Sequence, residues 1–241
     1  MSDPVFLVDA IPAADGFVLD GPEGHHAADV QRLQPGETLL LSDGAGGVAS
    51  ARVAAAERGS LRLDILERRT LPTTEPKLTV VQALPKGDRG ERAVQMLTEI
   101  GVDEVIPWAA SRSIVQWKGP RGEKARAKWT ATAREASKQA RRARLAHVAE
   151  LHTTKQLVHR LRAADTVLVL HEEAVLPLSR AVLPEAGEVA LVIGPEGSIS
   201  PDELAALAEF GEPVRLGETV LRTSTAGPAA LAVLQARLGR W

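Results

Sequence analysis

The chain has 241 residues, a formal net charge of −2 and no cysteine. The lack of cysteine excludes disulfides, thiolate nucleophiles and zinc or iron–sulfur sites built from Cys. No apolar run approaches the roughly 20 residues of a membrane helix, and the first 15 residues carry acids where a signal peptide has a basic segment. We therefore expect a cytoplasmic protein that makes no membrane contact.

Short strands dominate the expected structure of the first 70 residues. Each candidate segment is β-branched or alternating and is broken by Gly, Pro or Asp. The expected strands cover residues 5–8, 16–19, 38–42, 47–55 and 60–66, and one helix is expected over residues 25–33. This pattern predicts a small β-barrel over residues 1–70.

The rhythm of the sequence changes after a short linker. Residues 71–76 hold two prolines and two threonines, which suit an extended connection. Beyond it we expect strands over residues 78–83, 105–108, 114–115, 166–170, 189–193 and 213–216, and helices over residues 89–100, 122–144 and 229–237. Alternating elements predict an α/β domain over residues 77–241, with a parallel sheet covered by helices.

A glycine-rich loop follows the strand expected at residues 189–193. Gly194 and Gly197 flank Pro195 and Glu196, and glycines let backbone groups approach a ligand closely. Ser200, Pro201 and Glu203 then form an N-cap, a first helical residue and a capping box. Because ligands of open α/β sheets bind beyond the carboxyl ends of strands, this loop predicts either a binding site or an ordinary βα turn.

Two further strand ends carry unusual loops. After residues 213–216, the apolar Val220 and Leu221 stand in a loop beside Arg222. They either fill a gap in the core or form a floor for a flat ring, with Arg222 reaching a polar or anionic group. The strand at residues 166–170 is followed by His171 and two glutamates. The three loops predict one shared pocket, without a dinucleotide fingerprint, a P-loop or a metal site.

One strongly basic stretch stands out on an otherwise acidic chain. Residues 118–144 carry a net charge of +8, which leaves −10 for the remainder. On a helix, Arg134, Lys138, Arg141 and Arg142 would share one face. Three tryptophans lie nearby in sequence, and cations beside aromatics favour a nucleic-acid backbone over a merely solvated helix face.

Several motifs together resemble one known family. They are Ile193-Gly-Pro-Glu-Gly197 with Ser200-Pro-Asp-Glu203, Leu216-Gly-Glu-Thr-Val-Leu-Arg-Thr-Ser-Thr-Ala226, His25-His26 with Val30-Gln-Arg-Leu33 and Pro35-Gly36, Lys86-Gly87 with Thr98-Glu-Ile-Gly-Val102, Ser111-Arg-Ser113, and residues 135–142. In this order they resemble the ribosomal RNA small subunit methyltransferase E family of the SPOUT methyltransferases.

The resemblance implies a PUA-like, RNA-binding β-barrel in front of an α/β methyltransferase domain with a trefoil knot. It implies a homodimer that uses S-adenosylmethionine to methylate N3 of a uridine in 16S ribosomal RNA of the small subunit. No metal is implied, because the cofactor brings the activated methyl group.

The resemblance also implies roles for particular residues. Arg222 would stabilise the developing uracil anion, and Glu196 would orient the cofactor or act as the base. The implied cofactor-binding residues are Leu170, His171, Glu172, Ile193, Gly194, Pro195, Glu196, Gly197, Leu216, Gly217, Val220, Leu221 and Arg222. The implied RNA-binding residues are Arg32, Lys86, Arg89, Arg112, Arg134, Lys138, Gln139 and Arg142.

The chain departs from the family pattern at a few positions. Asp29 stands where Arg is common, Met96 where Lys is common, and Lys138 where Glu is frequent. Ser198 replaces Gly, and Ser224 replaces Glu, so no base is assigned at position 224. A SPOUT enzyme for a ribose 2′-hydroxyl or another base, and a non-catalytic rRNA-binding assembly factor, remain as alternatives.

Overall fold

The computed structural model describes residues 3–241, which divide into two compact units. The N-terminal unit comprises the chain up to Thr73 together with Ser137–Leu145, and the C-terminal unit comprises Thr74–Ala136 and Ala146–Trp241. The first boundary falls inside the segment expected as a linker. Within residues 3–241, no helix is both long enough and apolar enough to cross a membrane.

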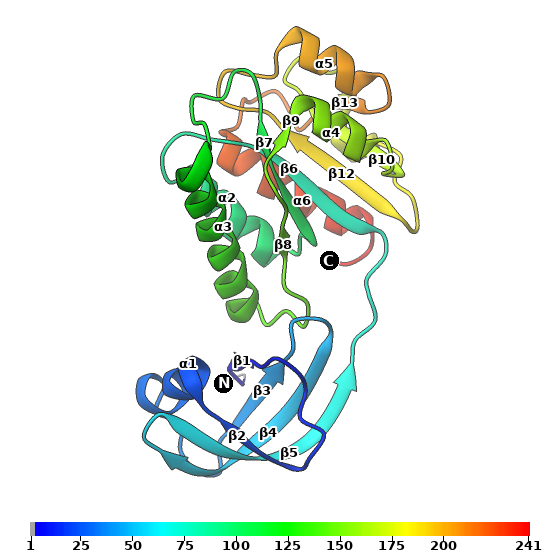
Figure 1. The fold of residues 1–241 in the computed structure, drawn as a ribbon. Helices are drawn as coiled ribbons and strands as arrows, with labels where there is room; N and C mark the ends of the chain where they lie inside the picture. The colour runs from blue at the N-terminus through cyan, green and yellow to red at the C-terminus, as the bar shows by residue number, and fades with distance from the viewer. Residues whose placement is uncertain (1–2) are drawn as a thin grey trace. The chain divides into compact units, whose positions relative to one another are not determined.

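The N-terminal unit is built on a five-stranded sheet (Figure 1). Its order is β1-β3-β4-β5-β2, parallel between β1 and β3 and antiparallel elsewhere. The strands are β1 (Val5–Leu7), β2 (Gly16–Leu19), β3 (Thr38–Ser42), β4 (Gly47–Glu57) and β5 (Ser60–Thr70). Side chains alternate between core and solvent: Leu61 and Leu63 of β5 are buried, whereas Arg62 and Asp64 are exposed.

The helix expected over residues 25–33 is displaced in the structure. An α-helix, α1 (Gly21–His25), runs directly into a π-helical turn, η1 (His26–Val30). Pro22 stands in the first turn of α1, where its missing N–H costs no helical bond. The helical segment therefore begins earlier than expected and ends before Arg32, whose φ is +56°.

The expectation of a basic helix over residues 122–144 is wrong at its C-terminal end. Helix α3 (Gly119–Gln139) stops because Arg141 adopts a left-handed φ of +54°. Its N–H bonds to the carbonyl of Lys138, and that of Arg142 bonds to Ser137, which is the Schellman termination. Arg141 and Arg142 therefore lie beyond the helix and share no helix face with Arg134.

After this termination the chain joins the N-terminal unit. The N–H of Gly46 donates to Ala143, and the N–H of Leu145 donates to Gly44. The Arg144 guanidinium donates to the carbonyls of Ala45 and Leu71. These bonds explain why residues 137–145 belong to the N-terminal unit although they lie far away in sequence.

The C-terminal unit contains an eight-stranded, wholly parallel sheet (Figure 1). Its order is β11-β13-β10-β12-β6-β7-β8, with β9 also paired to β7. The strands are β6 (Lys77–Ala83), β7 (Glu104–Ala109), β8 (His147–Val148), β9 (His152–Thr153), β10 (Thr166–Leu170), β11 (Leu176–Pro177), β12 (Glu188–Ile193) and β13 (Glu212–Arg215). The helices are α2 (Arg89–Ile100), α3, α4 (Thr154–Leu161), the short η2 (Leu178–Arg180), α5 (Pro201–Ala208) and α6 (Thr223–Arg237).

Both faces of this sheet are buried, which makes three layers. On β12, Leu191 packs into the core with α2, α3 and α6, whereas Val192 packs into the core with α4 and α5. Successive side chains of a strand point to opposite faces, so the consecutive apolar residues 189–193 of β12 contribute to both cores. The expected α/β architecture is thus confirmed.

Local signals in the sequence explain several helix ends. Helix α2 ends at Gly101, whose φ is +108°. Helix α5 begins with the expected capping box between Ser200 and Glu203, with Pro201 in its first turn. The strand expected at residues 114–115 is absent from the described chain, because β8 and β9 already occupy the edge of β7.

An ion-pair cluster lies where β6, β7 and β12 begin. The Lys77 ammonium contacts Glu104 at 2.6 Å, and the Arg160 guanidinium contacts Glu188 at 2.7 Å and Glu104 at 3.1 Å. Burial raises the pKa of both carboxyls, but the bonds and charges of Lys77 and Arg160 outweigh it and lower the pKa below the ordinary 4.5. Both carboxylates are therefore ionised in the folded protein.

This cluster predicts acid sensitivity of the C-terminal unit. Below pH 4.5 the unfolded chain binds protons at these carboxyls before the folded chain does, so stability falls as the pH drops through their folded pKa. Urea unfolding from pH 7 to pH 3, followed by tryptophan fluorescence, measures the effect. We expect Glu188→Gln to make the fall in the free energy of unfolding with falling pH less steep. An equally steep fall in the variant would contradict the role given to this cluster.

Candidate active site

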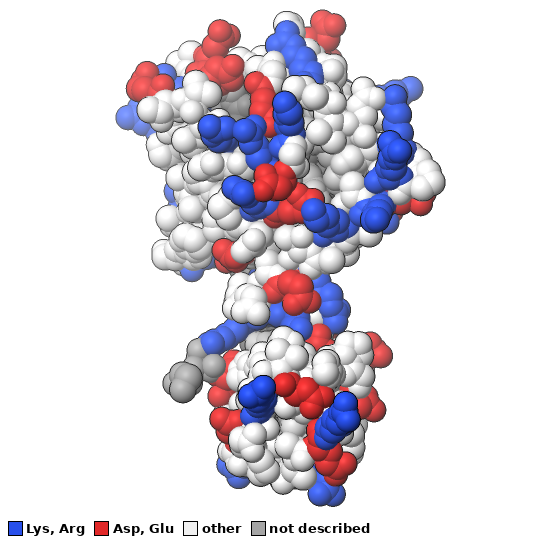
Figure 2. Space-filling model, turned by 90° about the vertical axis from the view of Figure 1, so that its left-hand side faces the viewer, with Lys and Arg blue, Asp and Glu red and all other residues white. Residues whose placement is uncertain are grey.

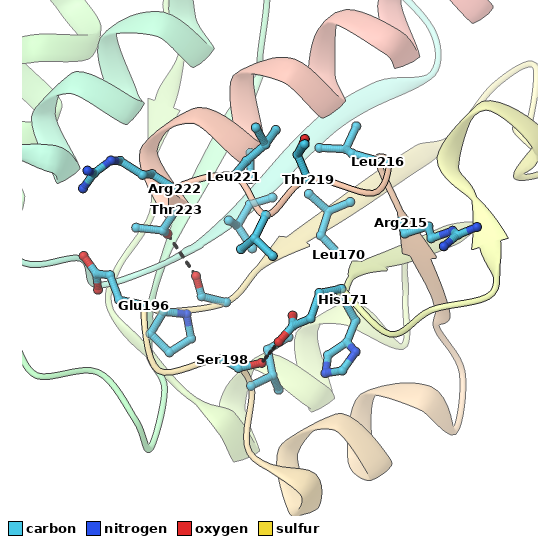
Figure 3. Close-up of a pocket in the computed structure, with 18 of the residues that line it drawn as sticks. Leu170, His171, Glu196, Ser198, Arg215, Leu216, Thr219, Leu221, Arg222 and Thr223 are labelled. Atoms are coloured by element: carbon cyan, nitrogen blue, oxygen red, sulfur yellow. Dashed lines mark hydrogen bonds between the residues drawn. The ribbon is translucent and has the colours of Figure 1, made fainter.

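A cavity of about 410 Å³ lies at the carboxyl ends of three neighbouring strands. In the sheet β10 stands between β13 and β12, so the loops that follow these strands meet at one edge. The loops are residues 171–175, 194–200 and 216–222. The expected convergence of three strand ends is therefore observed (Figure 3).

The cavity wall contains all but one of the residues expected to bind the cofactor; Gly197 is the exception. Of the other lining residues, Arg89 was expected as an RNA contact, and Glu218 and Thr219 stand inside the expected loop 216–222. Sequence reasoning missed Ser198, Ile199, Val214, Arg215, Thr223 and Ala226. Each stands within four positions of an expected residue, so extending each loop by a few positions would have found them.

Two glycines of the cavity wall differ in how closely they are packed. A Cβ on Gly194 would lie 2.7 Å from the Ile199 side chain, so glycine is required there for close packing. Gly217 is exposed, a Cβ on it would meet no atom within 4 Å, and its φ is not positive. Neither packing nor backbone conformation therefore requires glycine at position 217.

A buried hydroxyl ties two of the loops to the sheet. The Thr223 Oγ1 donates to the carbonyl of Gly194 at 2.9 Å and accepts from Gln82 Nε2 at 2.9 Å. Gln82, the residue before the last of β6, is fully buried, and Thr223 is only 6% exposed. This bridge fixes the start of α6 against the glycine-rich loop, and no sequence motif pointed to it.

The expected catalytic residues reach the same side of the cavity (Figure 3). Arg222 precedes α6, and its carbonyl accepts from Thr225 and Ala226. The backbone is thus held, while the side chain is exposed. Within residues 3–241 we find no ion pair or hydrogen bond of its guanidinium, which leaves it available for a ligand.

Glu196 is held by two donors from the start of α2. Its Oε1 accepts from the Lys86 N–H at 3.0 Å and from the Arg89 guanidinium at 3.0 Å. Burial raises the pKa of this carboxyl, but the hydrogen bonds from Lys86 and Arg89 lower it by more, so the pKa lies below its ordinary value. A weakened base with an occupied oxygen is better suited to holding a loop than to removing a proton.

A second carboxylate fixes the loop between β7 and α3. Glu203 is buried and accepts from the N–H of Ser111 at 2.8 Å, its hydroxyl at 2.7 Å and the Thr154 hydroxyl at 2.7 Å. Burial raises its pKa, but these bonds outweigh that effect. The neighbouring Arg112 donates to the carbonyl of Gly197 at 3.1 Å, so this loop supports the cavity wall.

The residues expected to bind RNA fall into two groups. In the C-terminal unit, Lys86 and Arg112 are exposed, Arg89 is half-buried beside the cavity, and Arg134 is exposed on α3. In the N-terminal unit, Arg32 is exposed, Gln139 ends α3 and Arg142 lies just beyond it. Lys138 also belongs to that unit, but its side chain is only 9% exposed and its ammonium lies 2.9 Å from Glu23. This ion pair disfavours a phosphate contact for Lys138, which stays a prediction.

Acidic side chains also offset part of the basic stretch. Figure 2 shows Lys and Arg side chains interspersed with Asp and Glu over the C-terminal unit. Lys128 pairs with Glu91 at 2.9 Å, and Arg126 pairs with Glu150 at 2.9 Å. These pairs are exposed enough to exchange for other partners, so the surface remains compatible with a polyanion.

Comparison with known proteins agrees with this architecture. Residues 73–235 match the family model of an RNA methyltransferase domain, and residues 19–66 match that of an RNA methyltransferase PUA domain. Ribosomal RNA small subunit methyltransferase E of Mycobacterium bovis is 46% identical over 98% of this chain and 93% of its own. The chain belongs to the ribosomal RNA small subunit methyltransferase E family. The Bacillus subtilis member of that family is 31% identical, with 93% of this chain and 91% of its own covered.

Solved structures of methyltransferases share the fold. The enzyme of Neisseria gonorrhoeae, bound to S-adenosyl methionine, superimposes with a TM-score of 0.86 at 26% identity, covering 98% of both chains. A putative methyltransferase from Legionella pneumophila, with the cofactor SAM bound, gives the same values. The α/β fold with a PUA domain and a methyltransferase domain is therefore that of the family.

Proposed function

We propose that this protein transfers the methyl group of S-adenosylmethionine to N3 of a uridine in 16S ribosomal RNA. The observation that carries the proposal is the cavity formed by three neighbouring strand ends in a member of the methyltransferase E family. The solved relatives that bind this cofactor cover almost the whole chain at a TM-score of 0.86.

The cavity suits a nucleoside with a charged tail. Its volume of about 410 Å³ lies in the usual range for small-molecule sites. Leu170, Ile193 and Leu216 give it an apolar wall. The carboxylates of Glu172 and Glu218 supply negative charge for a cation.

The chain's own residues would assist the reaction in distinct ways. When bound, the cofactor supplies a methyl group activated by a sulfonium. Arg222, with its backbone fixed and its guanidinium exposed at the cavity, would stabilise the negative charge that develops on the uracil as N3 loses its proton. Thr223 and Glu196 would hold the two loops at either side of the reacting groups.

Glu196 serves this proposal as a positioning group and not as the base. We expect Glu196→Gln to raise the KM for S-adenosylmethionine about 3- to 10-fold, because an amide oxygen is a weaker acceptor for Lys86 and Arg89. The kcat should change less than threefold at each pH of its profile. Steady-state kinetics from pH 6 to pH 9 test this expectation.

A matched control is Glu218→Gln, which removes another cavity carboxylate that pairs with an arginine, Arg215, at 3.1 Å. Its side chain is 86% exposed, so its effect should be smaller. A kcat of Glu196→Gln reduced a hundredfold, with one limb of the pH profile lost, would identify Glu196 as the base.

Ribosomal RNA contacts would come from both units. We propose Lys86, Arg89, Arg112 and Arg134 on the C-terminal unit, and Arg32, Gln139 and Arg142 on the N-terminal unit. Asp29, where the family often has Arg, pairs with His25 at 2.7 Å, so it supports no phosphate contact. Cation contacts to phosphates make binding salt-dependent.

Finer features of the family are proposed alongside the reaction. Strand β13 lies beyond β10 in the sheet, whereas the following α6 returns to contact β12, β6 and α2; this return path supports the SPOUT trefoil knot. We also propose a homodimer, as the family resemblance implies, and a cytoplasmic location, which a ribosomal RNA substrate favours. The domain limits 1–70, 71–76 and 77–241 form part of this proposal.

Methyl incorporation tests the proposed function. The purified chain is incubated with methyl-labelled S-adenosylmethionine and one of three substrates. These are small subunits from a strain that lacks the gene, small subunits from the wild-type strain, and protein-free 16S RNA from the deletion strain. We expect label only in substrates from the deletion strain, recovered as N3-methyluridine after nucleoside digestion. Label on a ribose or on another base would overturn the N3 assignment, and cofactor or RNA binding without label would overturn the enzyme assignment.

A further inference from the structure

A serine occupies the strained backbone position of the glycine-rich loop. Ser198 has a φ of +62°, one of three positive values among the non-glycine residues that the structure describes. The loop's own glycines, Gly194 and Gly197, do not have positive φ. Close packing surrounds both glycines, since a Cβ would lie 2.7 Å from Ile199 at Gly194 and 3.2 Å from Arg112 at Gly197.

A left-handed conformation disfavours any residue with a side chain. Such strain persists where the surroundings hold it, and it is frequent at ligand clamps. The Ser198 N–H bonds to the carbonyl of Pro195 at 3.0 Å, which closes the turn. A glycine, which the family pattern has at this position, would make this turn without strain, so the serine side chain points to a function of its own.

That side chain connects two loops of the cavity. The Ser198 Oγ donates to Glu172 Oε1 at 3.0 Å (Figure 3). Ser198 follows β12 and Glu172 follows β10, two adjacent strands of the sheet. Both residues line the cavity, so the bond spans its wall between two strand ends.

We infer that Ser198 is a positioning residue that holds the Glu172 carboxylate at the cavity wall, where it accepts a hydrogen bond from an N–H or O–H group of the cofactor. The inference rests on the proposed binding of S-adenosylmethionine in this cavity. Independently, the pKa of Glu172 is lowered, chiefly by its own backbone N–H, with burial opposing and the Ser198 hydroxyl adding to the decrease. The carboxylate is therefore charged at neutral pH.

Two substitutions separate the hydroxyl from the backbone strain. Ser198→Ala keeps a side chain in the left-handed conformation but removes the hydroxyl. Ser198→Gly removes both the hydroxyl and the strain. If the hydroxyl positions Glu172, both variants should raise the Kd for S-adenosylmethionine about 3- to 10-fold, although the glycine variant should melt at a higher temperature than the alanine variant.

The experiment measures cofactor Kd by calorimetry, melting temperature, and steady-state kinetics on small subunits from the deletion strain. We expect a raised KM for the cofactor, with kcat and the KM for subunits within twofold of the wild type. A structural defect would lower the melting temperature and kcat together. Ser179→Ala, on an exposed serine of η2, serves as the matched control.

A double-mutant cycle with Glu172→Gln completes the test. The double variant Ser198→Ala, Glu172→Gln should raise the Kd by less than the product of the two single increases. A Kd within twofold of the wild type for both Ser198 variants would overturn the inference and leave the proposed function intact. A wild-type chain that does not bind S-adenosylmethionine would overturn the proposed function, and the inference with it.

Discussion

Replacing Arg222 by alanine is expected to reduce kcat by about 100- to 1,000-fold, the usual effect of removing one group that stabilises an anionic transition state. The guanidinium makes no hydrogen bond within the described chain, so its removal leaves no buried partner unsatisfied. The Kd for S-adenosylmethionine should therefore stay within about threefold, and the melting temperature should not change. Single-turnover methylation of unmodified small subunits, combined with calorimetry, measures both quantities.

Two further variants define what Arg222 contributes. Arg222→Lys keeps the charge but loses the planar fork of donors, so an intermediate rate is expected. Arg180→Ala, at an exposed arginine of η2 outside the cavity lining, should retain the wild-type rate. An Arg222→Ala enzyme with normal turnover would remove this residue from the mechanism.

Thr223→Val is expected to destabilise the C-terminal unit by about 2–4 kcal/mol, since valine has the same shape but leaves two buried hydrogen-bond partners without their hydroxyl. Those partners are the carbonyl of Gly194 and the amide of Gln82. The loosened loop should also weaken S-adenosylmethionine binding at least tenfold. All four tryptophans lie in the C-terminal unit, so urea unfolding followed by tryptophan fluorescence reports on this unit alone.

Thr225→Val is the matched control for that variant. Thr225 stands two residues further along α6 and is exposed, so the same chemical change should alter stability by less than about 0.5 kcal/mol. If Thr223→Val behaved like this control in both stability and Kd, the bridge between β6, the glycine-rich loop and α6 would be dispensable.

Much of the fold could be predicted from local patterns. Five consecutive apolar residues, 189–193, marked the buried strand β12, and alternating helices imply a parallel sheet. Gly101 and the pair Ser200 and Glu203 marked helix ends correctly, because capping depends on a few adjacent residues. The three strand-end loops could be expected to converge because parallel strands share one carboxyl edge.

The misplaced features depend on distant parts of the chain. Helix α3 ends at a left-handed Arg141, a position where sequence patterns favour glycine. The burial of Lys138 against Glu23 joins positions 115 residues apart, and no periodicity encodes such a pair. Likewise, the role of Gln82 in the site depends on a bond to Thr223, 141 residues later.

The segment 137–145 has a consequence for synthesis of the protein. A ribosome synthesises the first 73 residues well before residue 145. The amide of Gly46 and the carbonyl of Gly44 can therefore form their bonds only after Ala143 and Leu145 have been added. The N-terminal unit thus reaches its final hydrogen bonding only after α3 has been made. A fragment that ends at Thr73 would therefore lack the hydrogen bonds that Ala143 and Leu145 make with Gly46 and Gly44.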